Sequence, residues 1–207
     1  MSQRGKFITL EGGEGVGKST QARALADALG KRGINVLVTR EPGGSDGAER
    51  IRELLLGGSN EWSASAEALL FAAARADHVE KLIAPALASG GWVLCDRFVD
   101  SSLAYQGGAG DSGINAVRAI NAFAIDGALP DRSLVLLLAD GANRAVARDN
   151  GASDAIGGRS GEYHRKVDDA FRSIAADEPQ RVRLIDASGS REVVTQRLLD
   201  AISDLLP

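Results

Sequence analysis

The chain has 207 residues, of which 44% are apolar and 25% are charged, and its formal net charge is −4. This length favours one domain spanning residues 1–207, and mild acidity without a basic run argues against a nucleic-acid partner. A single cysteine, Cys95, excludes a disulfide framework, and the absence of a signal peptide or a membrane-length apolar run predicts a cytoplasmic protein without a membrane partner.

Taken in chain order, short apolar runs alternate with longer segments of helical periodicity. The runs predict strands at residues 7–10, 34–38, 92–95, 134–138 and 182–185, and the periodic segments predict helices at 21–31, 64–88 and 191–206. In the Ala-rich helix 64–88 we expect Leu69, Leu70, Ala73 and Ala76 on the apolar side. Strands separated by helices indicate an α/β fold of three layers, in which a five-stranded parallel sheet carries helices on both faces. Segment 149–161, DNGASDAIGGRSG, is rich in Gly and Ser and is predicted to be a mobile lid loop.

The first expected strand runs into the sequence GGEGVGKST, which matches the spacing Gly-x4-Gly-Lys-Ser of a phosphate-binding loop (P-loop). Glycines let such a loop curl so that its N–H groups point at phosphate oxygens, while the lysine reaches the β and γ phosphates. The alternative is a Gly-rich turn with a coincidental Lys-Ser pair, but the flanking strand and helix favour the P-loop. The residues expected to bind ATP here are Gly12, Gly13, Glu14, Gly15, Val16, Gly17, Lys18, Ser19 and Thr20.

A magnesium ion usually accompanies a bound triphosphate, and two residues are candidates to hold it. Ser19 offers a hydroxyl directly after the loop lysine. Asp96 ends the apolar run 92–95, at the edge of the sheet where ligands bind in open α/β folds. The alternative for Asp96 is a turn-forming residue at a strand end.

The phosphate acceptor requires a second anion site, and the sequence has no Asn-Lys-x-Asp motif of the kind that reads guanine in regulatory GTPases. Arg40 and Arg97 each follow an expected strand, and Arg52 lies on the next helical stretch after Arg40. The planar guanidinium suits bidentate phosphate binding, although each arginine could equally be an ordinary surface residue.

Phe71 and Arg75 are four residues apart on the expected long helix and therefore share a face. An aromatic ring beside a guanidinium could stack on a planar base and hydrogen-bond its edge, although spacing alone favours a core Phe and a surface Arg. Ser102, Tyr105 and Gln106 have helical spacing too and could form a polar pocket wall or an exposed helix start.

Five stretches of the sequence, in the order found, together resemble the thymidylate kinase family: LEGGEGVGKSTQ, TREPGG, LLFAAARADH, VLCDRFVDSSLAYQG and ALPD. The similarity extends from the first expected strand to the last expected helix. It implies transfer of a phosphoryl group from ATP to dTMP with Mg²⁺, yielding dTDP, by a homodimer.

The resemblance also assigns roles to the candidate residues. It implies that Phe71 stacks on the thymine ring and that Arg75 bonds its edge. Arg97, with Arg40 and Arg52, would hold the acceptor phosphate, and Lys18 would share the transferred charge. The remaining implied contacts are Tyr105 against the deoxyribose, Ser102 and Gln106 on the base, and Glu14 near the sugar or the metal.

The lid departs from the family pattern, which places a catalytic arginine in an Asp-Arg pair followed by acids. Ala155 follows Asp154 where that arginine is expected. The candidates to replace it are Arg159 and the pair Arg144 and Arg148, with Arg148 or Arg159 expected to reach the phosphates. If none does, the chain could bind nucleotides with little turnover. A third possibility is a kinase that acts on another small nucleotide such as dUMP.

Overall fold

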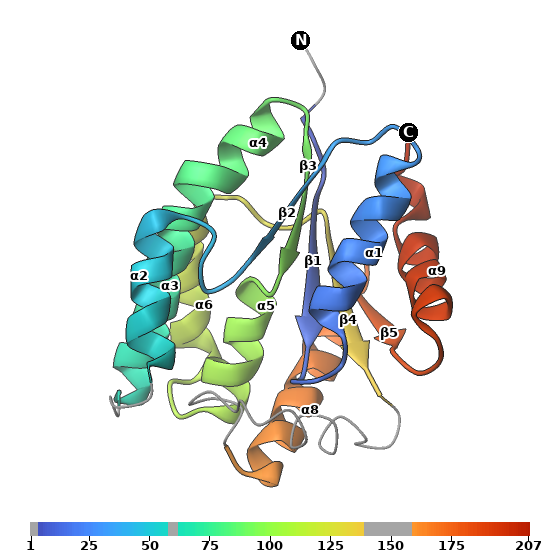
Figure 1. Cartoon of the computed structure of the whole chain (residues 1–207). Coiled ribbons are helices and arrows are strands. Elements are labelled where there is room, and N and C mark those ends of the chain that lie inside the picture. The colour runs from blue at the N-terminus through green and yellow to red at the C-terminus, as the bar shows by residue number, and fades with distance from the viewer. Residues whose placement is uncertain (1–3, 58–61, 139–158) are drawn as a thin grey trace.

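The computed structural model describes residues 4–57, 62–138 and 159–207, and it confirms the predicted α/β fold with a five-stranded parallel sheet (Figure 1). The strand order is β2-β3-β1-β4-β5, so the first strand lies in the middle. The strands are β1 (Phe7–Gly12), β2 (Val36–Arg40), β3 (Trp92–Asp96), β4 (Arg132–Leu137) and β5 (Val182–Asp186).

Helices cover both faces of the sheet. α1 and α9 pack on one face, residues of α3, α4, α5, α6 and α8 form the core on the opposite face, and α2 packs against α3 (Figure 1). The helices are α1 (Lys18–Gly30), α2 (Asp46–Leu56), α3 (Ala64–His78), α4 (Ala84–Ala88), α5 (Val99–Ser102), α6 (Ile114–Ile125), α8 (Gly161–Asp177) and α9 (Arg191–Ala201). Two π-helical turns, Val79–Ile83 and Leu103–Ala109, continue α3 and α5, and a 3-10 turn at Ser203–Leu205 follows α9.

The central strands are buried on both sides, as a parallel sheet between two helical layers requires. In β4, Leu134 and Leu136 face the core under α1 and α9, while Val135 and Leu137 face the core on the opposite side. Because side chains alternate along a strand, the continuous apolar run supplies both cores at once.

The predicted helix 64–88 is continuous in direction but contains a π-helical turn, and its buried side is not the one expected. The prediction of Leu69 on the apolar side was wrong, because Leu69 is 56% exposed. The buried side carries Phe71 and Arg75 instead. The other buried apolar residues of α3 are small alanines, and Arg75 and His78 are buried against polar partners on other elements, so the most hydrophobic residues did not mark the buried face.

Helices α6 and α8 were not predicted, although their buried residues recur with helical spacing, such as Val167, Phe171 and Ile174 in α8. α8 begins at Gly161, the last residue of the predicted lid. Most of that lid lies outside the described residues, so its predicted mobility stays a prediction.

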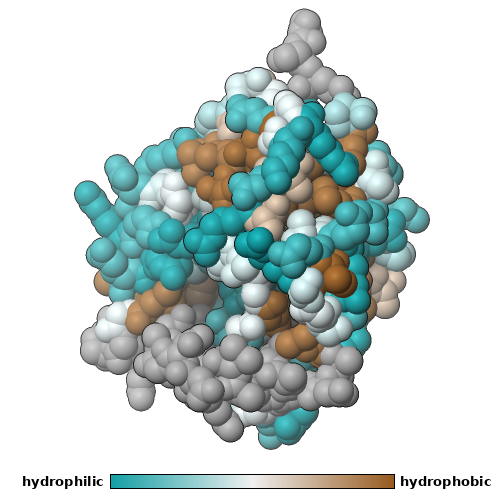
Figure 2. Space-filling model, turned by 45° about the vertical axis from the view of Figure 1, so that its right-hand side comes forward, coloured by the Kyte–Doolittle hydropathy of each residue, from teal (hydrophilic) through white to brown (hydrophobic). Residues whose placement is uncertain are grey.

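None of the helices in the described part of the chain is both long enough and apolar enough to cross a membrane. The face in Figure 2 shows hydrophobic residues in separate patches between hydrophilic ones.

Candidate functional site

The loop between β1 and α1 is shaped by glycines in conformations that other residues rarely adopt. Gly12, Gly15 and Gly17 have φ angles of 126°, 72° and 91°. A Cβ atom on Gly12 would lie 2.3 Å from the carbonyl oxygen of Leu136 on the neighbouring strand. The loop therefore curls tightly at the N-terminus of α1, where backbone N–H groups attract anions.

Lys18 begins α1 and folds back over this loop. Its side chain is buried, and Nζ donates a hydrogen bond to the carbonyl oxygen of Gly13 at 2.5 Å. Burial, followed by repulsion from Arg97, lowers the pKa of Lys18 to about 8. An anion bound in the loop would offset this repulsion.

Val16 differs from the other predicted loop residues, because its side chain packs in the core under α1.

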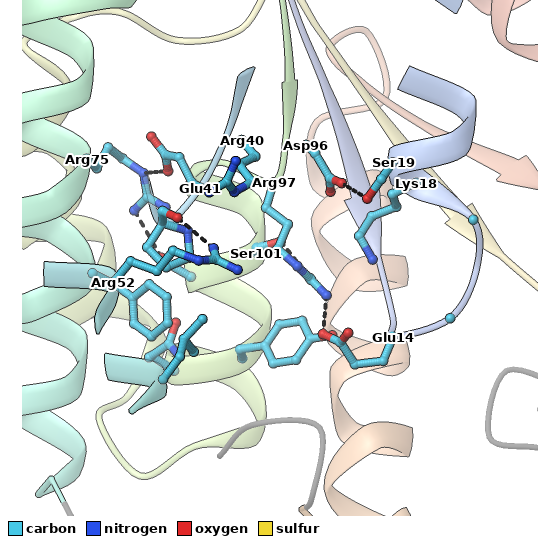
Figure 3. Close-up of a pocket in the computed structure, with 18 of the residues that line it drawn as sticks. Glu14, Lys18, Ser19, Arg40, Glu41, Arg52, Arg75, Asp96, Arg97 and Ser101 are labelled. Carbon is cyan, nitrogen blue, oxygen red and sulfur yellow. Dashed lines mark hydrogen bonds and ion pairs between the residues drawn. The ribbon is translucent and has the colours of Figure 1, made fainter. Parts of the chain in front are cut away.

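Ser19 and Asp96 lie side by side at the same edge of the sheet. The Ser19 hydroxyl donates to Asp96 Oδ2 at 2.5 Å (Figure 3). A hydroxyl and a carboxylate are hard oxygen ligands, and Mg²⁺ usually combines one or two such protein ligands with water and substrate phosphates. No cluster of three or more His, Cys, Asp or Glu side chains that could hold a metal occurs among residues 4–57, 62–138 and 159–207. The donor set therefore fits a magnesium ion shared with a nucleotide, not a cage built by the protein alone.

Arg97 follows β3 with a φ angle of 70°, in the left-handed region that disfavours residues with a side chain. Its Nη1 donates to the carbonyl oxygen of Gly12 at 3.0 Å, and its Nη2 pairs with Glu14. The guanidinium carbon lies 5.0 Å from the ring centre of Tyr105. Burial opposes the charge, but Tyr105 and Glu14 raise the pKa of Arg97, which therefore stays cationic. Backbone strain of this kind clusters at functional sites.

The ion pair between Arg97 and Glu14 joins the phosphate loop to the rest of the cavity (Figure 3). Burial raises the pKa of Glu14, but the larger combined attraction of Arg97 and Lys18 lowers it overall. Glu14 is therefore an ionised carboxylate that forms an ion pair with the guanidinium of Arg97. A phosphate entering here would compete with Glu14 for that guanidinium.

A buried carboxyl group lies beneath Arg97. Ser101 accepts a hydrogen bond from Arg97 Nη1 at 3.3 Å and donates to Glu11 Oε2 at 2.6 Å. The other oxygen, Glu11 Oε1, has no hydrogen-bond partner in the described part of the chain. Burial, followed by repulsion from Asp100, raises the pKa of Glu11 to about 8. Asp100 is held in turn by Arg181 at 2.7 and 2.8 Å.

These groups open into a cavity of about 380 Å³ (Figure 3). One end is formed by the phosphate loop and the other by α3 and the segment after β3. The lining residues are Glu14, Gly15, Gly17, Lys18, Ser19, Thr20, Arg40, Glu41, Pro42, Arg52, Leu56, Phe71, Arg75, Asp96, Arg97, Ser101, Ser102, Tyr105 and Gln106. One cavity thus contains most of the described residues that were predicted to bind the triphosphate, the metal and the acceptor. The exceptions, which do not line it, are Gly12, Gly13, Val16 and Arg159.

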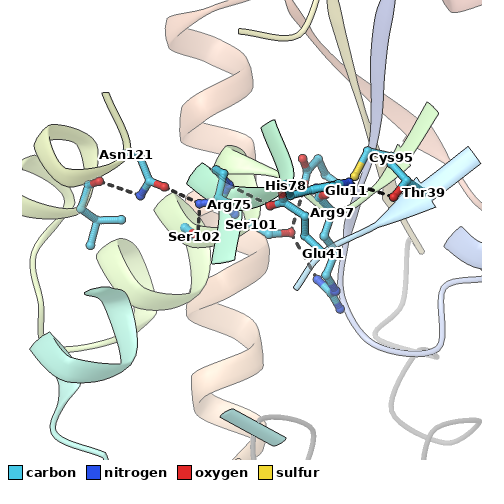
Figure 4. Close-up of polar contacts among 11 residues, drawn as sticks. Glu11, Thr39, Glu41, Arg75, His78, Cys95, Arg97, Ser101, Ser102 and Asn121 are labelled. Carbon is cyan, nitrogen blue, oxygen red and sulfur yellow. Dashed lines mark hydrogen bonds and ion pairs between the residues drawn. The ribbon is translucent and has the colours of Figure 1, made fainter. Parts of the chain in front are cut away.

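Arg75 is the most heavily bonded of the predicted base-contacting residues, and only 2% of it is exposed. Its Nε donates to Glu41 Oε2 at 2.8 Å, and its Nη1 donates to Ser102 Oγ at 3.0 Å and to Asn121 (Figure 4). His78 Nδ1 lies 3.0 Å from the other Glu41 oxygen. These hydrogen bonds to described residues use Nε and Nη1 and leave Nη2 for a ligand in the cavity. Spacing alone favoured a surface Arg75, and that alternative was wrong, because Arg75 is buried and paired with Glu41.

The two other predicted phosphate-binding arginines line the same cavity. Arg40 pairs with Glu49 at 3.0 Å, with 55% of its side chain exposed. Arg52 donates to the carbonyl oxygen of Pro42 at 2.7 Å. Figure 3 shows both side chains in the part of the cavity that Arg97 also faces.

The predicted polar wall lies on α5 and the π-helical turn after it. Tyr105 is buried, and its hydroxyl has no hydrogen-bond partner within the described ranges. Burial raises the pKa of Tyr105, so this hydroxyl stays neutral. Gln106 Nε2 donates to Oε1 of Glu67 at 2.9 Å, and Glu67 is an α3 residue that the sequence analysis did not single out.

Arg159 pairs with residues of α3 and α8, and that it reaches the phosphates stays a prediction. Its Nη2 pairs with Glu67 and its Nη1 donates to Tyr163 Oη at 2.6 Å. It does not line the cavity that holds the phosphate loop. Arg144, Arg148 and Ala155 lie outside the described residues, so the lid arginine stays a prediction.

Several residues of this site were missed by sequence reasoning. Glu67 is four residues before Phe71, so the helical spacing that paired Phe71 with Arg75 could also have included it. Glu41 and Asn121 are far from Arg75 in sequence, and no spacing signal connects them. Glu11 lies one residue before the end of β1, and nothing in its sequence context distinguishes it from a solvated acid.

The family model for thymidylate kinase matches residues 10–198. The chain is 58% identical to the thymidylate kinase of Rhizorhabdus wittichii over 98% of its own length and 99% of that protein. It is 49% identical to the thymidylate kinase of a Bradyrhizobium species, over 98% of this chain and 92% of that protein. The crystal structure of thymidylate kinase from Ehrlichia chaffeensis is similar, with a TM-score of 0.79 and 31% identity, covering 97% of this chain and 99% of that one.

Proposed function

The chain belongs to the thymidylate kinase family, and on that premise we propose that its central cavity binds ATP at the phosphate loop and dTMP at the opposite end. As a member of this family it catalyses the transfer of a phosphoryl group from ATP to dTMP, which yields ADP and dTDP. The observation that carries the placement of the substrates is the joining of the phosphate loop, three arginines and the Phe71–Arg75 face in one cavity. The relatives named above favour transfer to dTMP over binding without turnover or a different acceptor.

At the donor end, the loop backbone and Lys18 would hold the β and γ phosphates of ATP. Ser19 and Asp96 would hold the magnesium ion, which when bound neutralises phosphate charge and orients the transferred group. The hydrogen bond between Ser19 and Asp96 supports this, because it holds both oxygens within reach of one small cation.

At the acceptor end, Phe71 would stack on the thymine ring and Nη2 of Arg75 would donate to its carbonyl edge. The buried hydrogen bonds of Arg75 support this role, since they hold the guanidinium before a substrate arrives. Tyr105 would pack against the deoxyribose, and Arg40, Arg52 and Arg97 would hold the acceptor phosphate. Those three arginines share one part of the cavity.

The reaction joins a phosphate oxygen of dTMP to the γ phosphorus of ATP as the bond to the β-γ bridging oxygen breaks. Such a transfer depends on positioning and charge neutralisation. Arg97 is suited to this because it remains cationic in a buried site between the phosphate loop and the acceptor end. Once phosphates occupy Arg97, Glu14 would be released toward the sugar or the metal. A lid arginine, Arg148 or Arg159, would complete the charge stabilisation, with Arg144 on the nucleotide.

We further propose a homodimer, a single domain over residues 1–207 and a cytoplasmic location. α3 and α6 pack against each other, and each exposes a large apolar side chain, Leu69 at 56% and Phe123 at 89%. A second copy of the chain would cover such side chains. Sedimentation velocity at micromolar concentration tests the dimer, and a monomer would contradict it.

The experiment for the reaction is a coupled assay of ADP release with Mg-ATP and dTMP, dUMP or no acceptor. We expect strong dependence on dTMP and weaker use of dUMP, because one methyl group in an apolar pocket is worth about 1–3 kcal/mol. Arg97→Met should lower the rate at least about 100-fold, as the loss of a transition-state donor does. Arg172→Met changes an exposed arginine on α8 and should leave the rate unaltered. Equal ADP release with and without dTMP would disprove the proposed acceptor.

A further inference from the structure

One face of α3 carries an acid, an aromatic residue and an arginine, each one helical turn after the last. Glu67, Phe71 and Arg75 are spaced by four residues, so their side chains follow one line along the helix. Phe71 and Arg75 line the central cavity, whereas Glu67 lines a neighbouring cavity of about 320 Å³. Gln106 lines both cavities. The Gln106 side chain thus forms part of the wall between them, and Glu67 contacts it from outside the base-binding end.

Both carboxylate oxygens of Glu67 are engaged. Oε1 accepts from Gln106 Nε2 at 2.9 Å, and Oε2 accepts from Arg159 Nη2. The Glu67 side chain is 14% exposed. Arg159 is itself held by Tyr163, because its Nη1 donates to Tyr163 Oη at 2.6 Å and its guanidinium carbon lies 4.7 Å from that ring centre. Glu67 therefore has little freedom to turn away from Gln106.

A second contact holds the same stretch of chain. Tyr163 Oη donates to the carbonyl oxygen of Tyr105 at 2.8 Å, one residue before Gln106. Gln106 is only 4% exposed. Backbone and side chain are thus both fixed from the side of the neighbouring cavity.

A side-chain amide has a donor end and an acceptor end, and a carboxylate paired with an arginine only accepts. Glu67 therefore requires the NH₂ group of Gln106 to point toward it, which leaves Oε1 as the end available to the central cavity. We propose that Glu67 is a positioning residue that holds Gln106 in this orientation, so that the kinase selects pyrimidines that carry a hydrogen on ring nitrogen N3. This inference rests on the proposed binding of the base near Gln106 and Arg75.

The orientation complements the other polar group at the base. Arg75 Nη2 is a donor and requires an acceptor on the pyrimidine, such as the 4-carbonyl oxygen of thymine or uracil. Gln106 Oε1 is an acceptor and requires a donor, such as their N3–H. Cytosine presents the reverse pattern, with an acceptor at N3 and an amino donor at position 4. Glu67 thus makes the pocket complementary to a pyrimidine dione and mismatched to cytosine at two positions.

The test compares kcat/KM for dTMP and for 5-methyl-dCMP, which keeps the methyl group but reverses the hydrogen-bonding pattern. Glu67→Gln can both donate and accept, so the Gln106 amide becomes free to turn. We expect the preference for dTMP over 5-methyl-dCMP to fall about tenfold, mainly through KM, as the loss of one amide hydrogen bond predicts. Glu67→Met, which has no acceptor, should produce a similar loss. Glu80→Gln changes an exposed acid after α3 and should leave the preference unchanged.

A double-mutant cycle with Gln106→Ala shows whether Glu67 acts through Gln106. In the Gln106→Ala background, Glu67→Gln should cause no further change in the preference. An unchanged preference in either folded Glu67 variant, or an equal loss with and without Gln106, would overturn the inference. Neither result would affect the proposed reaction, which fails only if the wild-type enzyme shows no dTMP-dependent turnover.

Discussion

The buried ion pair between Glu41 and Arg75 gives a sharp test of how this site is held together. The Arg75 Nε to Glu41 Oε2 distance is 2.8 Å, and the two side chains are 2% and 3% exposed. Glu41→Gln keeps the shape of the side chain but removes its charge, which leaves the guanidinium buried without its counterion. Breaking a buried pair from one side costs about 3–5 kcal/mol of folding free energy.

The magnitude can be separated from other contacts by a double-mutant cycle. Arg75→Met also removes the hydrogen bonds to Ser102 and Asn121, but that loss occurs with or without Glu41 and cancels in the cycle. The double variant buries neither charge. Its destabilisation should therefore be smaller than the sum of the two single losses by at least about 2 kcal/mol.

The assay is urea unfolding of the nucleotide-free enzyme, followed by circular dichroism. The exposed pair of Arg40 and Glu49 serves as the control, since its N–O distance is also short, at 3.0 Å, but its side chains are 55% and 40% exposed. The same cycle with Arg40→Met and Glu49→Gln should give no more than about 1 kcal/mol of coupling. Additive losses at Glu41 and Arg75, within about 0.5 kcal/mol, would refute the reasoning.

Two further predictions concern residues at the end of β1. Folding raises the pKa of Glu11 from 4.5 to about 8. As the pH rises between these two values, the wild-type protein should therefore lose stability relative to Glu11→Gln. The difference in unfolding free energy should change by up to about 1.4 kcal/mol per pH unit, with Glu53→Gln as control, and a pH-independent difference would contradict it. Gly12→Ala should destabilise the protein by at least about 2 kcal/mol and weaken ATP binding, because its Cβ would lie 2.3 Å from the Leu136 carbonyl oxygen. Gly33→Ala is the control, because Gly33 also has a positive φ but a Cβ there meets no atom within 4 Å. Thermal unfolding measures the stability of both variants, and calorimetry measures their ATP binding. Equal losses of stability in the two variants would exclude the clash as the cause.

Patterns that depend on neighbouring residues were readable from the sequence. The five strands were all found, because apolar runs of that length between helices have few other uses. The phosphate loop was readable because glycine, lysine and serine must occur at set intervals to curl around a phosphate. Asp96 and Arg97 could be placed near it because the carboxyl ends of parallel strands meet at one edge.

The partners of Arg75 could not be read in this way. Glu41, directly after β2, and Asn121 on α6 contact it from 34 and 46 residues away in sequence. The error over Leu69 has the same origin, since the buried side of α3 combines Phe71 and small alanines with the polar Arg75 and His78, while the larger Leu69 is exposed. Periodicity reports which side of a helix is hydrophobic, not which side is covered.

The sequence by itself therefore determined the order of the strands along the chain, the phosphate loop and the family resemblance, since each depends on short-range spacing. Only the tertiary structure decided that Glu11 is buried beneath Arg97, that Glu14 occupies the guanidinium of Arg97, and that Glu67 orients Gln106. Those relations depend on which distant segments the parallel sheet brings together. The charge and orientation of a buried polar group are set by the partners that folding supplies, and the linear chain does not show them.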